Sequence, residues 1–123
     1  MIYQVPVQVE TFYIPAQSDA AAERFVFAYT ITIRNDSVGP VKLLRRYWSI
    51  TDANGKHTEV RGDGVVGEQP ELEPGSSYTY TSGAVLETPV GTMQGHYEMQ
   101  TKDGDLFEAP IPLFRLAVPN VLN

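Results

Sequence analysis

Hydrophobic side chains recur at every second position along most of this chain, and this period constrains the fold more than any other feature. In residues 24–36, aromatic residues and isoleucines occupy alternate positions, with smaller or polar residues between them. A strand sends successive side chains to opposite faces, so such a segment offers one face to a core. The alanine-rich residues 18–23 are too short for a stable isolated helix. Six further segments predict strands: 4–14, 41–52, 57–61, 78–82, 96–101 and 106–116.

The connections between these segments predict an antiparallel order. Asn54-Gly55 and Asp103-Gly104 are hairpin signals, because both residue types tolerate positive φ. Clusters of asparagine, serine, proline and glycine mark the other breaks. We therefore predict an all-β fold, an antiparallel seven-stranded β-sandwich.

Length and composition fit one soluble domain over residues 1–123. The 42% hydrophobic and 20% charged fractions are ordinary, and the absence of cysteine excludes disulfides and thiolate metal sites. The sequence shows neither a signal peptide at its start nor an apolar run of about 18 residues. We expect a cytoplasmic location without membrane insertion.

Charge is unevenly distributed along the chain. The net charge of −6 argues against nucleic acid as the main partner, since phosphate binding requires concentrated positive charge. Residues 24–61 nevertheless hold seven of the nine cations, and the part beyond residue 62 carries nine carboxylates. This is either a solvated surface of mixed sign or a basic face that meets an acidic partner.

Pro110 and Pro112 lie two residues apart in the last predicted strand. Alternate residues direct their backbone N–H groups to the same side, so both missing donors fall along one edge. We expect this strand at a sheet border, where the prolines hinder pairing with another strand.

Residues 61–70 contain the spacing G-x-G-x-x-G at Gly62, Gly64 and Gly67. A dinucleotide site needs a helix directly after the glycines, but Pro70 and Pro74 prevent one, and the neighbouring carboxylates would repel phosphate. We interpret the glycines as backbone devices for positive φ or close approach. Successive amides that form an anion-binding nest remain the alternative.

Catalytic and metal-binding signatures are weak. His96 and Glu98 share a strand face, but two ligands do not make a metal site, and no sequence suggests a nucleophile elbow. We expect neither enzyme activity nor a cofactor.

A second candidate surface lies in residues 41–52. Trp48 on a central strand is usually a core residue, and Arg45 and Arg46 precede it. One arginine must share the face of Trp48 or leave it at a bulge. It then either reaches solvent at the rim of the sandwich or forms, with the other two residues, a basic-aromatic patch for a partner's carboxylate or phosphate.

Four stretches together resemble the ApaG family: LLRRYWSITDANGK, VRGDGVVGEQPELEPG, YTSGAVLETPVGTMQGHYEM and FEAPIPLFRLAVP. The resemblance implies a fibronectin type III-like or immunoglobulin-like sandwich and bacterial proteins associated with cobalt and magnesium tolerance. Related domains in eukaryotic F-box and polymerase-interacting proteins imply an interaction module. It assigns no catalytic residue.

We therefore expect a non-enzymatic module that binds another protein, with a homo-oligomer left open. The alternatives are a small-anion or nucleotide (pyrophosphate) binder and, more weakly, a divalent-metal sensor at His96 and Glu98. Adjacent valines cannot both point inward, so we expect Val65 or Val66 to be exposed. The segment 82–95 is the second expected contact loop. The first comprises Gly62, Gly64, Val65, Val66, Gly67, Glu68, Gln69 and Pro70.

Overall fold

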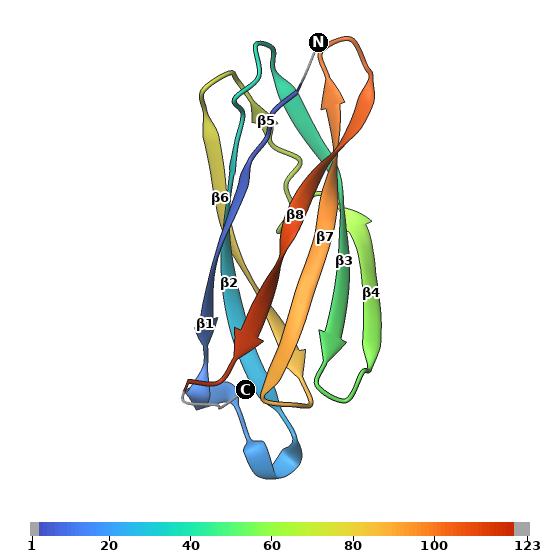
Figure 1. The fold of residues 1–123 in the computed structure, drawn as a ribbon. Coiled ribbons are helices and arrows are strands. Elements are labelled where there is room, and N and C mark those ends of the chain that lie inside the picture. The colour runs from blue at the N-terminus through green and yellow to red at the C-terminus, as the bar shows by residue number, and fades with distance from the viewer. Residues whose placement is uncertain (1–2, 120–123) are drawn as a thin grey trace.

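The computed structural model describes residues 3–119 as two antiparallel β-sheets packed face to face (Figure 1). The only helical elements in this part are the 3₁₀ turns η1 (Pro15–Gln17) and η2 (Ala20–Ala22). The all-β prediction is therefore confirmed. The strands are β1 (Val7–Tyr13), β2 (Phe25–Arg34), β3 (Val41–Asp52), β4 (His57–Asp63), β5 (Glu71–Leu72), β6 (Ser77–Leu86), β7 (Val90–Thr101) and β8 (Leu106–Ala117).

The smaller sheet has the order β1-β2-β6, and the larger has the order β4-β3-β7-β8 with β5 paired to β3. The structure thus has eight strands where the sequence predicted seven. The additional strand, β5, has two residues between prolines, too few to show a period. The expected loop 82–95 is also wrong in extent, because most of it belongs to β6 and β7.

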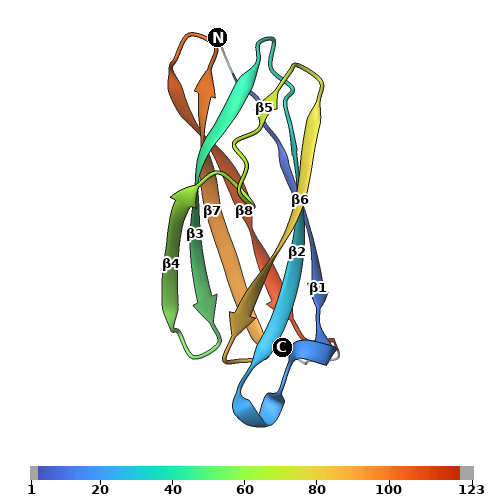
Figure 2. The ribbon, with the colours of Figure 1, turned by 180° about the vertical axis from the view of Figure 1, so that it is seen from behind.

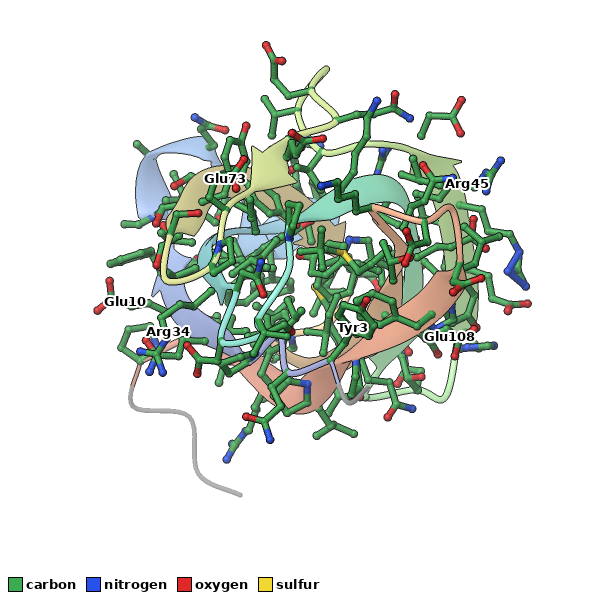
Figure 3. The ribbon with its side chains drawn as sticks, turned by 90° about the horizontal axis from the view of Figure 1, so that it is seen from above. Tyr3, Glu10, Arg34, Arg45, Glu73 and Glu108 are labelled. Atoms are coloured by element: carbon green, nitrogen blue, oxygen red, sulfur yellow. The ribbon has the colours of Figure 1, made fainter. Side chains whose placement is uncertain are left out.

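The core lies between the sheets and follows the alternation seen in the sequence. Phe27, Tyr29, Ile31 and Ile33 of β2 are buried, whereas the outer face of this sheet carries threonines. Seen along the sandwich, Glu10, Arg34 and Glu108 point away from the molecule while the interior is filled by side chains (Figure 3).

A bulge in β3 explains why the inward residues of that strand change parity. The pairing of β3 with β7 shifts between Leu43 and Arg45. Before the shift Val41 and Leu43 face the core, and after it Trp48 does. An uninterrupted period of two counted back from Trp48 would place Leu44 inside, but the bulge puts Leu43 there instead.

The two predicted hairpins join β3 to β4 and β7 to β8. Asp52 N–H donates to the Lys56 carbonyl at 3.0 Å, and Gly55 takes φ +83° while Asn54 does not take positive φ. This is a glycine-terminated turn rather than the two-residue form that Asn-Gly favours.

The long sides of the sandwich differ. On one side β1 packs against β8 (Figure 1). On the other side, between β6 and β4, the chain from β4 to β5 runs between the sheets (Figure 2). That segment contains the glycines singled out above.

Candidate interaction site

The glycine loop, residues 62–70, is tied to β3 at both ends. Gly64 N–H donates to the Leu44 carbonyl at 2.8 Å, and Leu43 N–H donates to the Pro70 carbonyl at 2.9 Å. The side-chain amide of Gln69 also donates to the Leu44 carbonyl, at 3.0 Å. The loop is therefore anchored on the bulge of β3, where the ladder between strands is interrupted.

The tip of the loop is a two-residue hairpin turn. Val65 and Glu68 exchange backbone hydrogen bonds of 2.8 and 3.0 Å. The residues between them, Val66 and Gly67, have φ of +48° and +79°. Positive φ at both central positions is the signature of a type I′ turn, so the loop is a tight hairpin rather than an irregular segment.

The three glycines serve different physical purposes. A Cβ at Gly62 would lie 2.8 Å from the Arg46 guanidinium, which rests on this position. Gly64 has φ +62°, and a Cβ there would collide with the Glu68 carbonyl. Gly67 has open space around it and is needed only for its positive φ. The backbone interpretation of the motif is therefore supported at Gly64 and Gly67, whereas Gly62 makes room for a side chain.

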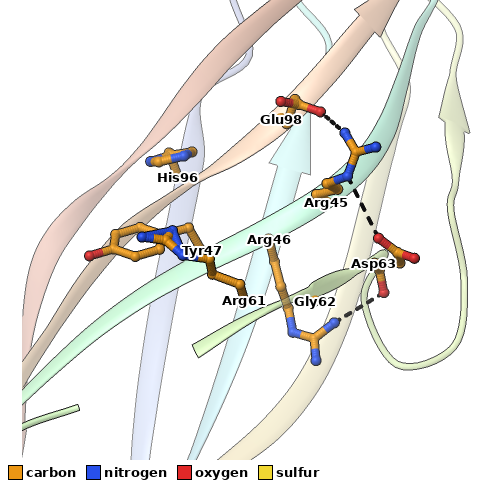
Figure 4. Close-up of a pocket in the computed structure, with 8 residues that line it drawn as sticks. All are labelled: Arg45, Arg46, Tyr47, Arg61, Gly62, Asp63, His96 and Glu98. Atoms are coloured by element: carbon orange, nitrogen blue, oxygen red, sulfur yellow. Dashed lines mark hydrogen bonds and ion pairs between the residues drawn. The ribbon is translucent and has the colours of Figure 1, made fainter. Parts of the chain in front are cut away.

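Arg46 fastens the loop to the sandwich (Figure 4). Its Nη1 donates to the carbonyls of Asp63 at 3.1 Å and Gly64 at 2.9 Å. Hydrogen bonds from a charged donor are stronger than neutral ones, and this one bridges consecutive carbonyls. Arg46 is thus the arginine that projects on the inner face and lies at the rim, as one of the two interpretations predicted.

The two adjacent valines at the tip of the loop differ in exposure. Val65 is fully buried, with 0% of its surface exposed, and it belongs to the core cluster. Val66 is 63% exposed. Val65 therefore anchors the turn from inside, and Val66 presents an apolar side chain to solvent.

The amides around the glycines are largely engaged. Gly64, Val65 and Glu68 all donate their N–H groups to backbone carbonyls. An anion-binding nest needs successive amides that converge on one open point. The amides of Val65 and Glu68 donate within the hairpin and that of Gly64 donates to β3, so these three donors are not available to an anion.

A cavity of about 360 Å³ lies between the glycine loop and the middle of β6. Its walls come from Val65, Val66 and Gly67 on one side and from residues 80–82 on the other, with Arg46 and Trp48 reaching it from β3. The loop and β6 therefore enclose a groove on the open side of the sandwich.

The expected patch of Arg45, Arg46 and Trp48 is divided between two faces. Trp48 is only 2% exposed and packs edge-on against Tyr29 and Phe114 in the core. Its assignment to a surface patch is therefore wrong, because the inward parity after the bulge buries it. Arg45 faces outward and pairs with Glu98 and with Asp63 (Figure 4).

The aromatic residues of the outer face are Tyr47 and His96, neither of which was predicted to belong to the patch. Their rings stack at 5.1 Å, and the Arg61 guanidinium lies 4.5 Å from the Tyr47 ring centre (Figure 4). The Tyr47 hydroxyl donates to Glu59 at 2.6 Å, which raises the pKa of Tyr47 and lowers that of Glu59. Tyr47 lies two residues after Arg45, so the alternation of the strand could have placed both on the same face.

An open cavity of about 320 Å³ lies on this outer face, and Arg45, Arg61, Asp63 and Glu98 are among the residues that line it. Both carboxylates pair with Arg45, so much of the positive charge is compensated within the chain. The face is therefore a weaker candidate for an acidic partner than the count of arginines suggests.

His96 and Glu98 do not converge. His96 Nε2 lies 3.3 Å from a carboxylate oxygen of Glu108, whereas Glu98 pairs with Arg45. Residues 3–119 contain no group of three or more histidine and carboxylate side chains that could hold a metal ion. In the same range, no helix is long and apolar enough to cross a membrane.

Comparisons with known proteins agree with this architecture. Protein ApaG of Cronobacter sakazakii is 61% identical over 120 residues, which cover 98% of this chain and 96% of the relative. The structure of the ApaA protein from Bordetella pertussis superposes with a TM-score of 0.94 at 46% identity and covers 97% of both chains. A structural-genomics target, SoR45, gives a TM-score of 0.91 at 51% identity over 96% of this chain and 89% of its own.

The ApaG domain family matches residues 15–101, from η1 to the end of β7. This range includes the bulge of β3, Arg46 and the complete glycine loop. The chain belongs to the ApaG family.

Proposed function

We propose that this chain is a non-enzymatic protein–protein interaction module that contacts its partner through the tip of the glycine loop. The contact residue is Val66, and the rest of the loop holds it in place. The other residues of the expected contact loop contribute to the hairpin and its anchors rather than to recognition.

The conformation of Val66 carries this proposal. A β-branched residue at positive φ is strained, because its Cβ approaches the backbone, and glycine or asparagine fits the position better. Val66 has φ +48° and is 63% exposed, so core packing does not compensate the strain. Strained residues held by their surroundings gather at functional sites, and an exposed apolar side chain suits a partner's pocket.

The rigidity of the loop supports the same conclusion. Val65 is buried beneath the tip, and Arg46 binds two carbonyls at its base. A contact residue that is already fixed loses little conformational entropy on binding.

The anion-binding alternative has less support than the interaction module. Two amides of the loop donate within the hairpin and that of Gly64 donates to β3, and Asp63 and Glu68 would repel a phosphate. The association of the family with cobalt and magnesium tolerance would then be indirect and would act through the bound partner.

We assign the sandwich to the fibronectin type III-like class. The strands β1, β2 and β6 face β4, β3, β7 and β8, which is the division of strands between the sheets of such domains. The short β5 is an addition to that scheme.

Capture from native lysate with three baits tests the proposal: the wild type, Val66→Asn and Val38→Asn. Val38 is an exposed valine (77%) in the turn between β2 and β3, so its variant controls for the loss of any surface valine. We expect the Val66→Asn bait to lose the partner and the Val38→Asn bait to retain it. If all three baits retain the partner equally, the tip is not the contact.

A further inference from the structure

The free edge of β6 differs chemically from the free edges of β4 and β8, which end the larger sheet. Four strands end the two sheets: β1 and β6 in the smaller, β4 and β8 in the larger. Each such strand has one side on which its backbone donors and acceptors lack a neighbouring strand. The residues that face this side can be deduced from the register.

In the smaller sheet, Ile14 N–H donates to the Val26 carbonyl and Arg34 N–H donates to the Pro6 carbonyl. Even-numbered residues of β2 therefore direct their backbone groups to β1, and odd-numbered ones to β6. Tyr80 and Ser82 lie opposite odd-numbered residues of β2, so they form the bonded pairs with it. By the same alternation, the N–H and C=O groups of Ser77, Thr79, Thr81, Gly83 and Val85 face the free edge.

None of these edge-facing residues is charged, and β6 contains no proline or bulge over its 10 residues. In β4, by contrast, Asp52 N–H donates to the Lys56 carbonyl, which places the odd-numbered residues at the free edge. Those residues all carry ionisable side chains: His57, Glu59, Arg61 and Asp63. Charge on an edge discourages pairing with another strand, so β4 is protected and β6 is not.

The two remaining edges are protected in other ways. Thr101 N–H donates to the Asp105 carbonyl, and hydrogen-bonded pairs alternate with non-bonded pairs along β7 and β8. His96 and Pro110 therefore form a non-bonded pair. The nitrogen of Pro110 therefore faces the free edge of β8, where it offers no donor. The free edge of β1 is uncharged like that of β6, since Val7, Val9, Thr11 and Tyr13 face it, but it lies on the side where β1 packs against β8.

We propose that the β6 edge binds an extended segment of a partner protein, which adds a strand to the β1-β2-β6 sheet. The groove of about 360 Å³ beside residues 80–82 receives alternate side chains of that segment, and Val66 forms its outer wall. Strand addition draws affinity from backbone hydrogen bonds and specificity from such side-chain pockets. The edge is uncharged, so the chemistry that fits is an uncharged segment with β-branched or aromatic side chains. This inference deepens the proposed function and rests on it.

A second copy of this chain fits the edge less well than a separate segment. The tip of the glycine loop stands beside the middle of β6. Two β6 strands that paired about a twofold axis at that point would bring both tips to the same place. A single extended segment meets only one tip.

Thr81→Pro tests the proposal, because the backbone donor that it removes faces the free edge and not β2. The Thr81 hydroxyl lies 2.8 Å from that of Thr30, so Thr30→Val is the matched control that loses the same side-chain contact. Thr81→Lys, a charge at the same edge position, is the second variant if the proline impairs folding.

The probe is a phage-displayed library of random peptides of about ten residues, which matches the length of β6, selected on the full chain. We expect enriched peptides to lack proline and to alternate apolar with polar residues. Thr81→Pro and Thr81→Lys should weaken them at least about tenfold, and Thr30→Val should not. In NMR hydrogen exchange, binding should slow the amides of Thr79, Thr81 and Gly83.

Three results would overturn the inference: no enrichment of extended peptides, peptides that bind Thr81→Pro and the wild type equally, or a dimer in light scattering that Thr81→Pro disrupts. The same baits applied to lysate separate this inference from the proposed function. A partner lost by Val66→Asn but kept by Thr81→Pro leaves the tip as contact and removes the edge. A partner lost only by Thr81→Pro does the reverse.

Discussion

The two long sides of the sandwich handle their exposed edges in opposite ways. On the side where β1 packs against β8, Pro110 removes an edge donor. On the side of β6 and β4, the glycine loop enters the gap between the sheets and leaves a groove beside an uncharged strand. The edges of β8 and β4 are protected and that of β6 is not, and this difference is the basis of the strand addition proposed at β6.

The largest expected loss of stability comes from changing Gly64, because the conformation of the glycine loop depends on this residue. Gly64→Ala combines a left-handed φ with a collision against the Glu68 carbonyl, so the free energy of unfolding should fall by roughly 2 kcal/mol or more. Gly67→Ala meets only the conformational penalty and should lose about 1 kcal/mol. Urea unfolding measures both, and equal losses would show that the collision is relieved by movement of the loop.

Val65→Ala should reduce the free energy of unfolding by about 2 kcal/mol, because it leaves a void beneath the hairpin tip. Val85→Ala, on the exposed face of β6, is the control and should change it by less than about 0.5 kcal/mol. Similar losses in the two variants would mean that the loop does not depend on its inner anchor.

Arg46→Met keeps the apolar stem of the side chain and removes its hydrogen bonds to Asp63 and Gly64. We expect a loss of about 1.5 kcal/mol, together with faster hydrogen exchange in the loop but not in β8. If hydrogen exchange became equally faster in the glycine loop and in β8, Arg46 would support the whole fold rather than the loop alone.

The buried hydroxyls of Tyr80 and Tyr97 hydrogen-bond to each other. Their effect on the free energy of unfolding should be the smallest at neutral pH and should grow at alkaline pH. Burial raises the pKa of both above the ordinary value of 10.0. The unfolded chain then releases these protons at lower pH than the folded one, so stability should be complete below about pH 10 and fall above it. The double variant Tyr80→Phe, Tyr97→Phe should flatten that decline in urea midpoints measured against pH.

Much of this arrangement could be predicted from the sequence, because strands that bury one face have a strict period. The inward series of β2 and the hairpins at Gly55 and Gly104 were recognisable for that reason. The two-residue β5 was not, since it has no period and exists through its pairing with β3.

The site was predictable in its residues but not in its geometry. Local sequence indicated that Gly64 and Gly67 serve the backbone, but it could not show that Arg46 lies on Gly62. The bulge after Leu43 also decided the faces of Arg45 and Trp48. A bulge depends on the pairing of two distant strands, so a period counted along one strand cannot place it.

Under the proposed function, Val66 is kept in a strained and exposed position for contact rather than for stability. The most direct test is the urea unfolding of Val66→Asn compared with the wild type at neutral pH. Asparagine tolerates positive φ, so we expect the free energy of unfolding to rise by up to about 1 kcal/mol. A clear loss of stability in Val66→Asn would contradict the proposed role of Val66 as a contact residue, because Val66 would then be a structural residue.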